Sequence, residues 1–179
     1  MIDRMGFKGM ISLYIGSGKG KTTAAIGQAV RAHGAGFRVL FVQFLKGRHT
    51  SEVKSLERLG IEVCRCEGVE KFFSFMEIDE KQSCAAAVLG CFERAVIAST
   101  SGEYQLIILD EILDAVKLNI LTDSEIATFL KNRSENCEIV LTGRSAGSQV
   151  SSIADYITDM RKVRHPFDNG VQAREGVEY

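Results

Sequence analysis

The stretch GSGKGKTT, residues 16–23, follows an apolar run at residues 10–15 and opens a segment whose apolar residues recur at helical spacing. Glycines let successive backbone N–H groups turn inward around an anion, Lys21 adds a mobile positive charge, and the Thr22 hydroxyl can bind a magnesium ion. The alternative without a binding function is a glycine-rich turn with solvated lysines, but the order of strand, loop and helix favours a phosphate-binding loop. The candidate nucleotide-binding residues are therefore Gly16, Ser17, Gly18, Lys19, Gly20, Lys21, Thr22 and Thr23.

The loop is a variant of the usual phosphate-binding pattern. The pattern G-x-x-x-x-G-K-[ST] requires glycine at position 15, where this chain has Ile15. The first glycine comes one residue late, which shortens the cradle and leaves open the direction in which a triphosphate lies.

A second signature is the apolar run LIILDE, residues 106–111, which ends in Asp110 and Glu111. In phosphate-loop proteins such a strand lies beside the first strand and brings an acid to the magnesium ion opposite the loop threonine. The two carboxylates could instead simply begin a helix, where acids are favourable. With the loop present we favour the metal role, and the predicted ligands are Thr22, Asp110 and Glu111.

The order of the remaining elements predicts the fold class. We expect strands near residues 10–15, 38–44, 61–66, 106–111, 138–142 and 156–160, and helices near residues 22–33, 51–59, 78–99, 111–118, 122–133 and 148–154. Alternation of this kind predicts an α/β fold, an open, mostly parallel sheet with helices on both faces, in a single domain over residues 1–179. Ligands bind outside the carboxyl ends of such strands, where the loop, Asp110, Glu111 and Arg144 would emerge.

Composition narrows the possible partners and the compartment. The chain has 179 residues and a net charge of −1, which gives no broad reason to bind nucleic acid or an anionic membrane. Its five cysteines form no C-x-x-C pair and resemble reduced cytosolic thiols. No uninterrupted apolar run approaches the length of a membrane helix, and the start of the chain lacks the layout of a signal peptide. We expect a cytoplasmic protein that binds neither nucleic acid nor membrane.

Several segments together resemble one family, the ATP:corrinoid adenosyltransferases of the phosphate-loop type. The matching stretches are residues 16–47, LIILDEI at 106–112, VLTGR at 140–144 and RHPFDNGVQAREGVEY at 164–179. The resemblance implies a P-loop NTPase-like (RecA-like) fold and transfer of the 5′-deoxyadenosyl group of ATP to the cobalt of a reduced corrinoid, with release of triphosphate. It also implies Mg²⁺ or Mn²⁺ as cofactor, ATP held in the reverse sense with its terminal phosphate deep in the loop, a homodimer and a flavoprotein reductant. Arg144 is a further candidate nucleotide-binding residue.

The resemblance also gives a role to the aromatic segment at residues 72–76. Family members displace the lower axial ligand of cobalt with a Phe-x-Trp pair after the third strand, and the nearest match here is Phe73-Ser74-Phe75. This chain contains no Trp, and Phe72 could replace either counterpart. Core filling is the alternative reading of the cluster. Many relatives cover the corrinoid with a longer N-terminal segment, whereas here only about nine residues precede the first strand. The corrinoid could then be covered by a partner subunit, by this aromatic segment, or not at all.

Two other functions share the same motifs. A kinase or ATPase that cleaves between phosphates would use the same loop and the same Asp110–Glu111 strand end. A non-catalytic nucleotide- or corrinoid-binding protein would bind the ligands without turnover. The resemblance favours the adenosyltransferase, with Lys21, Phe73 and Phe75 as its catalytic residues.

Overall fold

The chain forms one twisted parallel sheet in a computed structural model that describes residues 7–46, 50–68, 71 and 73–179. The strand order is β3-β2-β4-β5-β1-β6, and every pairing between these strands is parallel. The bounds are β1 Ile11–Ile15, β2 Val39–Gln43, β3 Glu62–Arg65, β4 Leu106–Asp110, β5 Glu138–Thr142 and β6 Tyr156–Asp159. The predicted α/β class, with an open and mostly parallel sheet, is confirmed.

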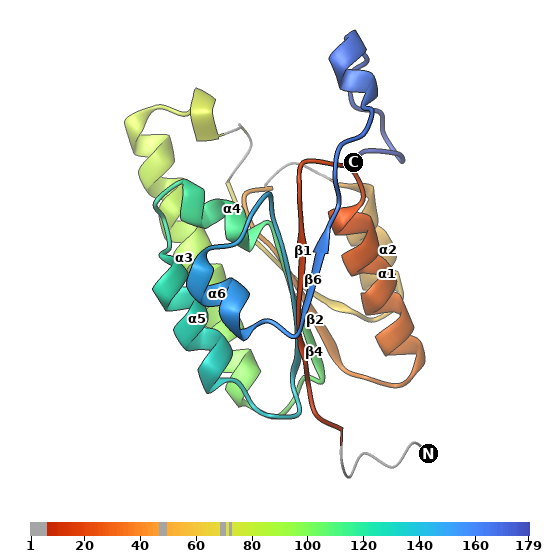
Figure 1. The fold of residues 1–179 in the computed structure, drawn as a ribbon, viewed down its shortest axis with the longest axis vertical. Helices are drawn as coiled ribbons and strands as arrows, with labels where there is room; N and C mark the ends of the chain where they lie inside the picture. The colour runs from red at the N-terminus through yellow and green to blue at the C-terminus, as the bar shows by residue number, and fades with distance from the viewer. Residues whose placement is uncertain (1–6, 47–49, 69–70, 72) are drawn as a thin grey trace.

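Helices cover both faces of the sheet, as predicted (Figure 1). One face carries α1 Lys21–Gly34 and α2 Ser51–Arg58. The other face carries α3 Ile78–Thr100, α4 Ile112–Lys117, α5 Asp123–Asn132 and α6 Ser148–Ile153. Two short 3₁₀ turns, η1 Phe73–Phe75 and η2 Pro166–Asn169, project beyond the end of the sheet at which the loop lies.

The central strand β4 shows why the sequences of the inner strands are continuous apolar runs. Successive side chains of a strand point to opposite faces. Accordingly, Leu106 and Ile108 pack in the cluster under α1 and α2, whereas Ile107 and Leu109 pack in the cluster under α3 to α6. A strand that is buried on both faces has no polar alternation, and β4 is buried over its whole length.

One expectation about strand order was wrong. The strand that ends in Asp110 does not lie beside β1, because β5 pairs with both and separates them. Apolar runs carry no signal for which neighbour a buried parallel strand takes, since the helical crossovers let any two strands pair. The acid nevertheless reaches the loop, as the site geometry shows below.

Helix α3 meets the length and hydropathy expected of a membrane-spanning segment, although the sequence contains no long uninterrupted apolar run there. Core helices of globular domains share this length and hydropathy. In the structure one side of α3 packs on the sheet, with Cys84, Val88, Cys91 and Ala95 buried. We therefore describe α3 as a core helix of the domain.

Candidate active site

The loop between β1 and α1 is held by neighbouring segments as well as by its own glycines. The Gly16 N–H donates to the carbonyl oxygen of Arg144 at 3.1 Å, and the Gly18 N–H donates to that of Met160 at 2.7 Å. Gly16 and Gly20 have φ values of 115° and 116°, which side chains rarely tolerate. A Cβ atom on Gly16 would lie 2.5 Å from both the Asp159 carboxylate and the Met160 carbonyl oxygen. Glycine is thus required by conformation and by space.

The Lys21 ammonium lies inside the loop. Its Nζ atom donates to the carbonyl oxygens of Gly16 at 2.7 Å and Gly18 at 2.8 Å. Burial lowers the pKa of Lys21, while nearby carboxylates oppose this effect and the Arg144 guanidinium adds to it. Because the first N–H groups of α1 have no acceptor within the helix, Lys21 and the helix N-terminus together form a site suited to phosphate.

A buried carboxylate connects the loop to the middle of the sheet. Asp110 is fully buried at the end of β4, and its Oδ1 atom accepts hydrogen bonds from Thr22 Oγ1 at 2.9 Å and Thr142 Oγ1 at 2.8 Å. The strand that separates β4 from β1 thus supplies Thr142, which bridges the gap. Asp110 and Thr22 are brought together as the sequence predicted.

The centre of this cluster is a lysine that sequence reasoning missed. Lys46 Nζ lies 3.1 Å from Asp110 Oδ2, 3.1 Å from Glu111 Oε1 and 3.2 Å from Thr22 Oγ1. Burial alone would lower the pKa of Lys46, but the attraction of Asp110 and Glu111 outweighs it and raises the pKa well above its usual value. Burial is also the main cause that raises the pKa of Glu111, and Lys46 opposes that shift. Its signals in the sequence were its position three residues beyond the end of β2 and its place in the family-like stretch at residues 16–47.

The oxygen atoms around Lys46 fit a divalent cation. Mg²⁺ binds hard oxygen ligands and usually takes one or two carboxylates together with substrate phosphates and water. Thr22, Asp110 and Glu111 provide one hydroxyl and two carboxylates around one point. Within the described ranges no group of three or more His, Cys, Asp or Glu side chains could hold a metal by itself. A cation here would thus depend on phosphate ligands.

The backbone near this cluster adopts left-handed conformations at residues other than glycine. Leu45 has φ of 57° and Glu111 has φ of 67°. Such residues are uncommon and concentrate at functional sites. The Glu111 N–H donates to Thr142 Oγ1 at 2.8 Å, which helps to hold that turn. Sequence patterns gave no indication of either conformation.

The other predicted nucleotide-binding residues lie at the surface of the loop or next to it. Ser17, Lys19 and Thr23 are exposed, and Gly20 begins α1 as its N-cap residue. Arg144 is exposed just after β5, its N–H donates to Asp114 Oδ1, and its carbonyl oxygen accepts from Gly16. The predicted loop residues and Arg144 are thus brought to one end of the sheet.

The C-terminal tail folds back onto the loop, a contact that the sequence did not predict. Glu178 accepts hydrogen bonds from Lys19 Nζ at 2.8 Å and from the Arg174 side chain at 3.1 Å and 3.2 Å. The Ser51 hydroxyl, at the start of α2, donates to the carbonyl oxygen of Tyr179. Arg174 first and Lys19 second lower the pKa of Glu178 to about 2. The tail therefore lines one side of the site.

The two predicted phenylalanines differ in their surroundings. Phe73 is half-buried, packs against the core cluster of the α3 face and lies 5.9 Å below the Lys81 ammonium. Phe75 is 76% exposed. Phe72, the alternative counterpart, lies outside the described residues. The structure thus separates an anchoring aromatic ring, Phe73, from one that is free to meet a ligand, Phe75.

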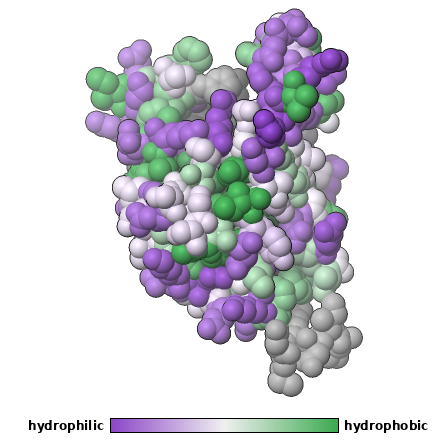
Figure 2. Space-filling view, in the orientation of Figure 1, coloured by the Kyte–Doolittle hydropathy of each residue, from purple (hydrophilic) through white to green (hydrophobic). Residues whose placement is uncertain are grey.

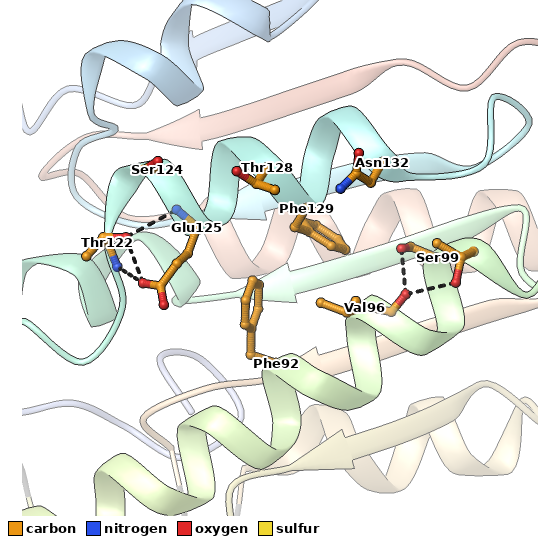
Figure 3. Close-up of a pocket in the computed structure, with 10 residues that line it drawn as sticks. Phe92, Val96, Ser99, Thr122, Ser124, Glu125, Thr128, Phe129 and Asn132 are labelled. Atoms are coloured by element: carbon orange, nitrogen blue, oxygen red, sulfur yellow. Dashed lines mark hydrogen bonds between the residues drawn. The ribbon is translucent and has the colours of Figure 1, made fainter.

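The molecular surface is notched at this end of the sheet (Figure 2). The projection formed by η1 and the start of α3 lies on one side of the notch, and the tail with η2 lies on the other (Figure 1). A separate cavity of about 310 Å³ lies between α3 and α5 (Figure 3) and is lined by residues of that helical layer, including Phe92 and Phe129. None of the predicted site residues lines that cavity.

These features define a nucleotide-binding protein of the phosphate-loop class, with a lysine and threonine at the start of a helix and an acid at the end of a neighbouring buried strand. The family described as ATP:corrinoid adenosyltransferase BtuR/CobO/CobP matches residues 7–179. The chain belongs to this family.

Relatives of known name support the same assignment. The chain is 32% identical over 173 residues to the corrinoid adenosyltransferase of Escherichia coli K12. The aligned region covers 96% of this chain and 86% of the relative. The corrinoid adenosyltransferase CobA of Salmonella typhimurium is also 32% identical, with the same coverage. A corrinoid adenosyltransferase from Sinorhizobium is 32% identical over 174 residues, covering 96% of this chain and 81% of the relative.

The close packing of Gly16 predicts a difference between two glycine substitutions. We expect Gly16→Ala to lower the free energy of unfolding by more than about 1 kcal/mol, because a Cβ is incompatible with both the φ value and the contact to residues 159 and 160. The matched control is Gly27→Ala, in the exposed middle of α1 with no atom within 4 Å of the added Cβ. It should raise stability by about 0.5–1 kcal/mol. Urea denaturation measures both, and equal stabilities would contradict the packing described for the loop.

The tail contact predicts a pH-dependent release at acidic pH. The pKa of Glu178 is lowered to about 2 in the folded protein, below its usual value, so the stabilising contact is complete above about pH 4.3. It should be lost as pH falls towards 2. NMR titration of the Glu178 carboxyl carbon and the Lys19 ammonium protons would follow the release, and Glu178→Gln should lack the transition. A midpoint at the ordinary value for glutamate would show that the tail contact is absent in solution.

Proposed function

We propose that this protein transfers the 5′-deoxyadenosyl group of ATP to the cobalt of a reduced corrinoid, either cob(I)alamin or a cobinamide-type precursor, and releases triphosphate. The observation that carries the proposal is the family match over residues 7–179, on a chain whose phosphate loop, buried acid and exposed aromatic residue lie at one end of the sheet. The same site would suit phosphate cleavage, but nothing in the comparisons favours that reaction.

The reaction needs no nucleophile from the protein. Reduced cobalt attacks the ribose C5′ carbon, the C5′–O bond breaks with both electrons moving to oxygen, and the whole triphosphate leaves. The protein therefore has to align two substrates and stabilise charge on the leaving group. Lys21, Arg144 and the N–H groups at the start of α1 are placed for the phosphates. We take ATP to lie in the reverse sense to most phosphate-loop proteins, as the resemblance implies.

Thr22, Asp110 and Glu111 are the proposed ligands of Mg²⁺, or of Mn²⁺ in its place. When bound, the cation would neutralise charge on the phosphates. Lys46 lies among the same oxygen atoms, so its ammonium group has to move when a cation enters with ATP. After this movement the Lys46 side chain is long enough to remain close to the phosphate loop. Lys46 is therefore, with Lys21, a proposed phosphate-binding residue.

We propose that the corrinoid occupies the notch between η1 and the tail. Phe75, exposed at the edge of the notch, would displace the lower axial ligand of cobalt(II), and Phe73 would anchor the turn against the core. Losing that ligand raises the reduction potential of cobalt. This makes reduction by a flavoprotein, the proposed physiological partner, easier.

The remaining features of the proposal concern assembly and location. We propose a single domain that acts as a homodimer in the cytoplasm and binds neither nucleic acid nor membrane. The edge strand β6 supports the dimer, because its four residues are exposed and include the apolar side chains Tyr156 and Ile157. The near-neutral net charge supports the absence of nucleic-acid binding.

Product analysis tests the reaction itself. Incubation with ATP, Mg²⁺ and chemically reduced cobalamin should yield intact triphosphate and light-sensitive adenosylcobalamin in equal amounts. Lys21→Ala should lower kcat by about 10²–10³-fold with either cobalt state, because one preorganised donor to the leaving group is lost. The control Lys131→Ala, on the exposed side of α5, should change the rate by less than about twofold. Release of ADP or phosphate without a cobalt–carbon bond would refute the proposal.

The aromatic turn is tested by comparing two cobalt states. Phe75→Ala should slow conversion of the cobalt(II) form by about tenfold or more, and that of pre-reduced cob(I)alamin much less, because removal of a Phe contact costs about 1.5–3 kcal/mol. Phe73→Ala should show the same bias together with a lower melting temperature, since Phe73 packs against the core. Leu89→Ala, an exposed apolar residue of α3, is the control. Equal losses with both cobalt states would exclude ligand displacement.

A further inference from the structure

Four of the five cysteines converge on the packing between β3 and α3, outside the site described above. Cys64 and Cys66 are two residues apart on β3 and its end, so they point to the same face of the sheet. Cys84 and Cys91 are seven residues apart on α3, which places them on one side of the helix. All four belong to or pack against the same core cluster. The fifth, Cys137, precedes β5.

Two of these thiols are in direct contact. Cys64 Sγ lies 3.7 Å from Cys91 Sγ and donates a hydrogen bond to it. A disulfide needs an S–S distance near 2.05 Å, so the two sulfur atoms have to approach by about 1.7 Å. Cys64 is half-exposed, whereas Cys66, Cys84 and Cys91 are buried. A small oxidant therefore reaches the pair through Cys64.

A third thiol, Cys66, lies near the pair. Cys91 is the main cause that lowers the pKa of Cys66. Cys64 lowers the pKa of Cys91, but Cys66 and burial outweigh it and raise that pKa to about 12. The hydrogen bond to Cys91 and burial also raise the pKa of Cys64 well above its usual value. Both members of the pair are therefore protonated thiols at neutral pH.

We propose that Cys64 and Cys91 form a redox-sensitive pair that closes to a disulfide and ties β3 to α3. With a low-molecular-weight disulfide as oxidant, one thiol attacks it to form a mixed disulfide and releases one small thiol. The second thiol then displaces the other small thiol. The two protein sulfurs lose two electrons and two protons, and the small disulfide gains them. A reducing cytosol keeps the pair open, so the bond is a response to oxidation.

The bond would enclose the aromatic turn η1, because this turn lies in the chain between Cys64 and Cys91. Phe73 packs against the same core cluster as both cysteines. A disulfide restricts the unfolded chain and fixes the two elements that flank the turn. The oxidised protein should therefore be more stable than the reduced one.

The experiment uses the full chain, reduced and then treated with glutathione disulfide before the remaining thiols are blocked. The mass should fall by that of two hydrogen atoms. Trypsin cleaves after Arg65, which separates Cys64 from Cys66, and after Lys81 and Arg94, which leaves Cys84 and Cys91 on one peptide. The expected cross-link joins residues 59–65 to residues 82–94, with fragmentation placing it on Cys91. The melting temperature should rise by roughly 5–10 °C and return on reduction.

Matched variants decide between this pair and its neighbours. Cys64→Ser and Cys91→Ser should lose the cross-link and the rise in melting temperature, whereas Cys84→Ser should keep both. Melting of each reduced variant verifies that it folds, and Cys64→Ala replaces Cys64→Ser if the hydroxyl disturbs folding. A cross-link from residues 66–71, or a stable glutathione adduct on Cys64 without an internal bond, would overturn the assignment.

Discussion

The arrangement of the site depends on one buried carboxylate, that of Asp110. An isolated charge in a protein interior is very unfavourable, so a buried carboxylate has to be paired and hydrogen-bonded. Asp110 meets this requirement with Thr22 from α1, Thr142 from β5 and Lys46 from the segment after β2. Three separate parts of the chain are thereby fixed around one group. Removing any of these partners would leave part of that charge unsatisfied, which is more damaging than removing a surface ion pair.

Much of the fold could be predicted because the buried faces of helices and strands give characteristic patterns of apolar residues in the sequence. The all-apolar β4 and the helical spacing in α1 and α3 predicted the element types. At the start of α5, Thr122 forms a capping box with Glu125. The order of strands gives no such pattern, and although β5 was predicted as a strand, its position between β1 and β4 was not. Lys46, Thr142 and Glu178 were also missed, because their roles come from contacts between segments far apart in the chain. The loop could be predicted from a short stretch of sequence, whereas its contacts with distant segments could not.

The structure gives a physical reason for the missing glycine of the loop. Position 15 still belongs to β1, where Ile15 pairs in register with Asp159 of β6. Residue 15 is therefore a strand residue in this chain, and the first turn of the loop begins at Gly16 with φ of 115°. The chain that follows β6 packs directly on Gly16 and Gly18. The shortened loop and the C-terminal segment thus form one unit, which explains why both departures from a generic phosphate loop occur together.

The distribution of charge around this unit suits a triphosphate that departs whole. Cleavage between two phosphates needs charge stabilised mainly at one phosphorus centre, whereas loss of the entire triphosphate leaves charge along its full length. Lys21 lies inside the loop, Lys46 lies at the acids beyond it, and Arg144 lies close enough to influence Lys21. These cations are spread over the end of the sheet, while η1, which carries the exposed Phe75, lies on the opposite side of the notch from the tail. In the proposed binding mode, a site divided in this way would hold the phosphates at its floor and leave the ribose carbon to face the second substrate.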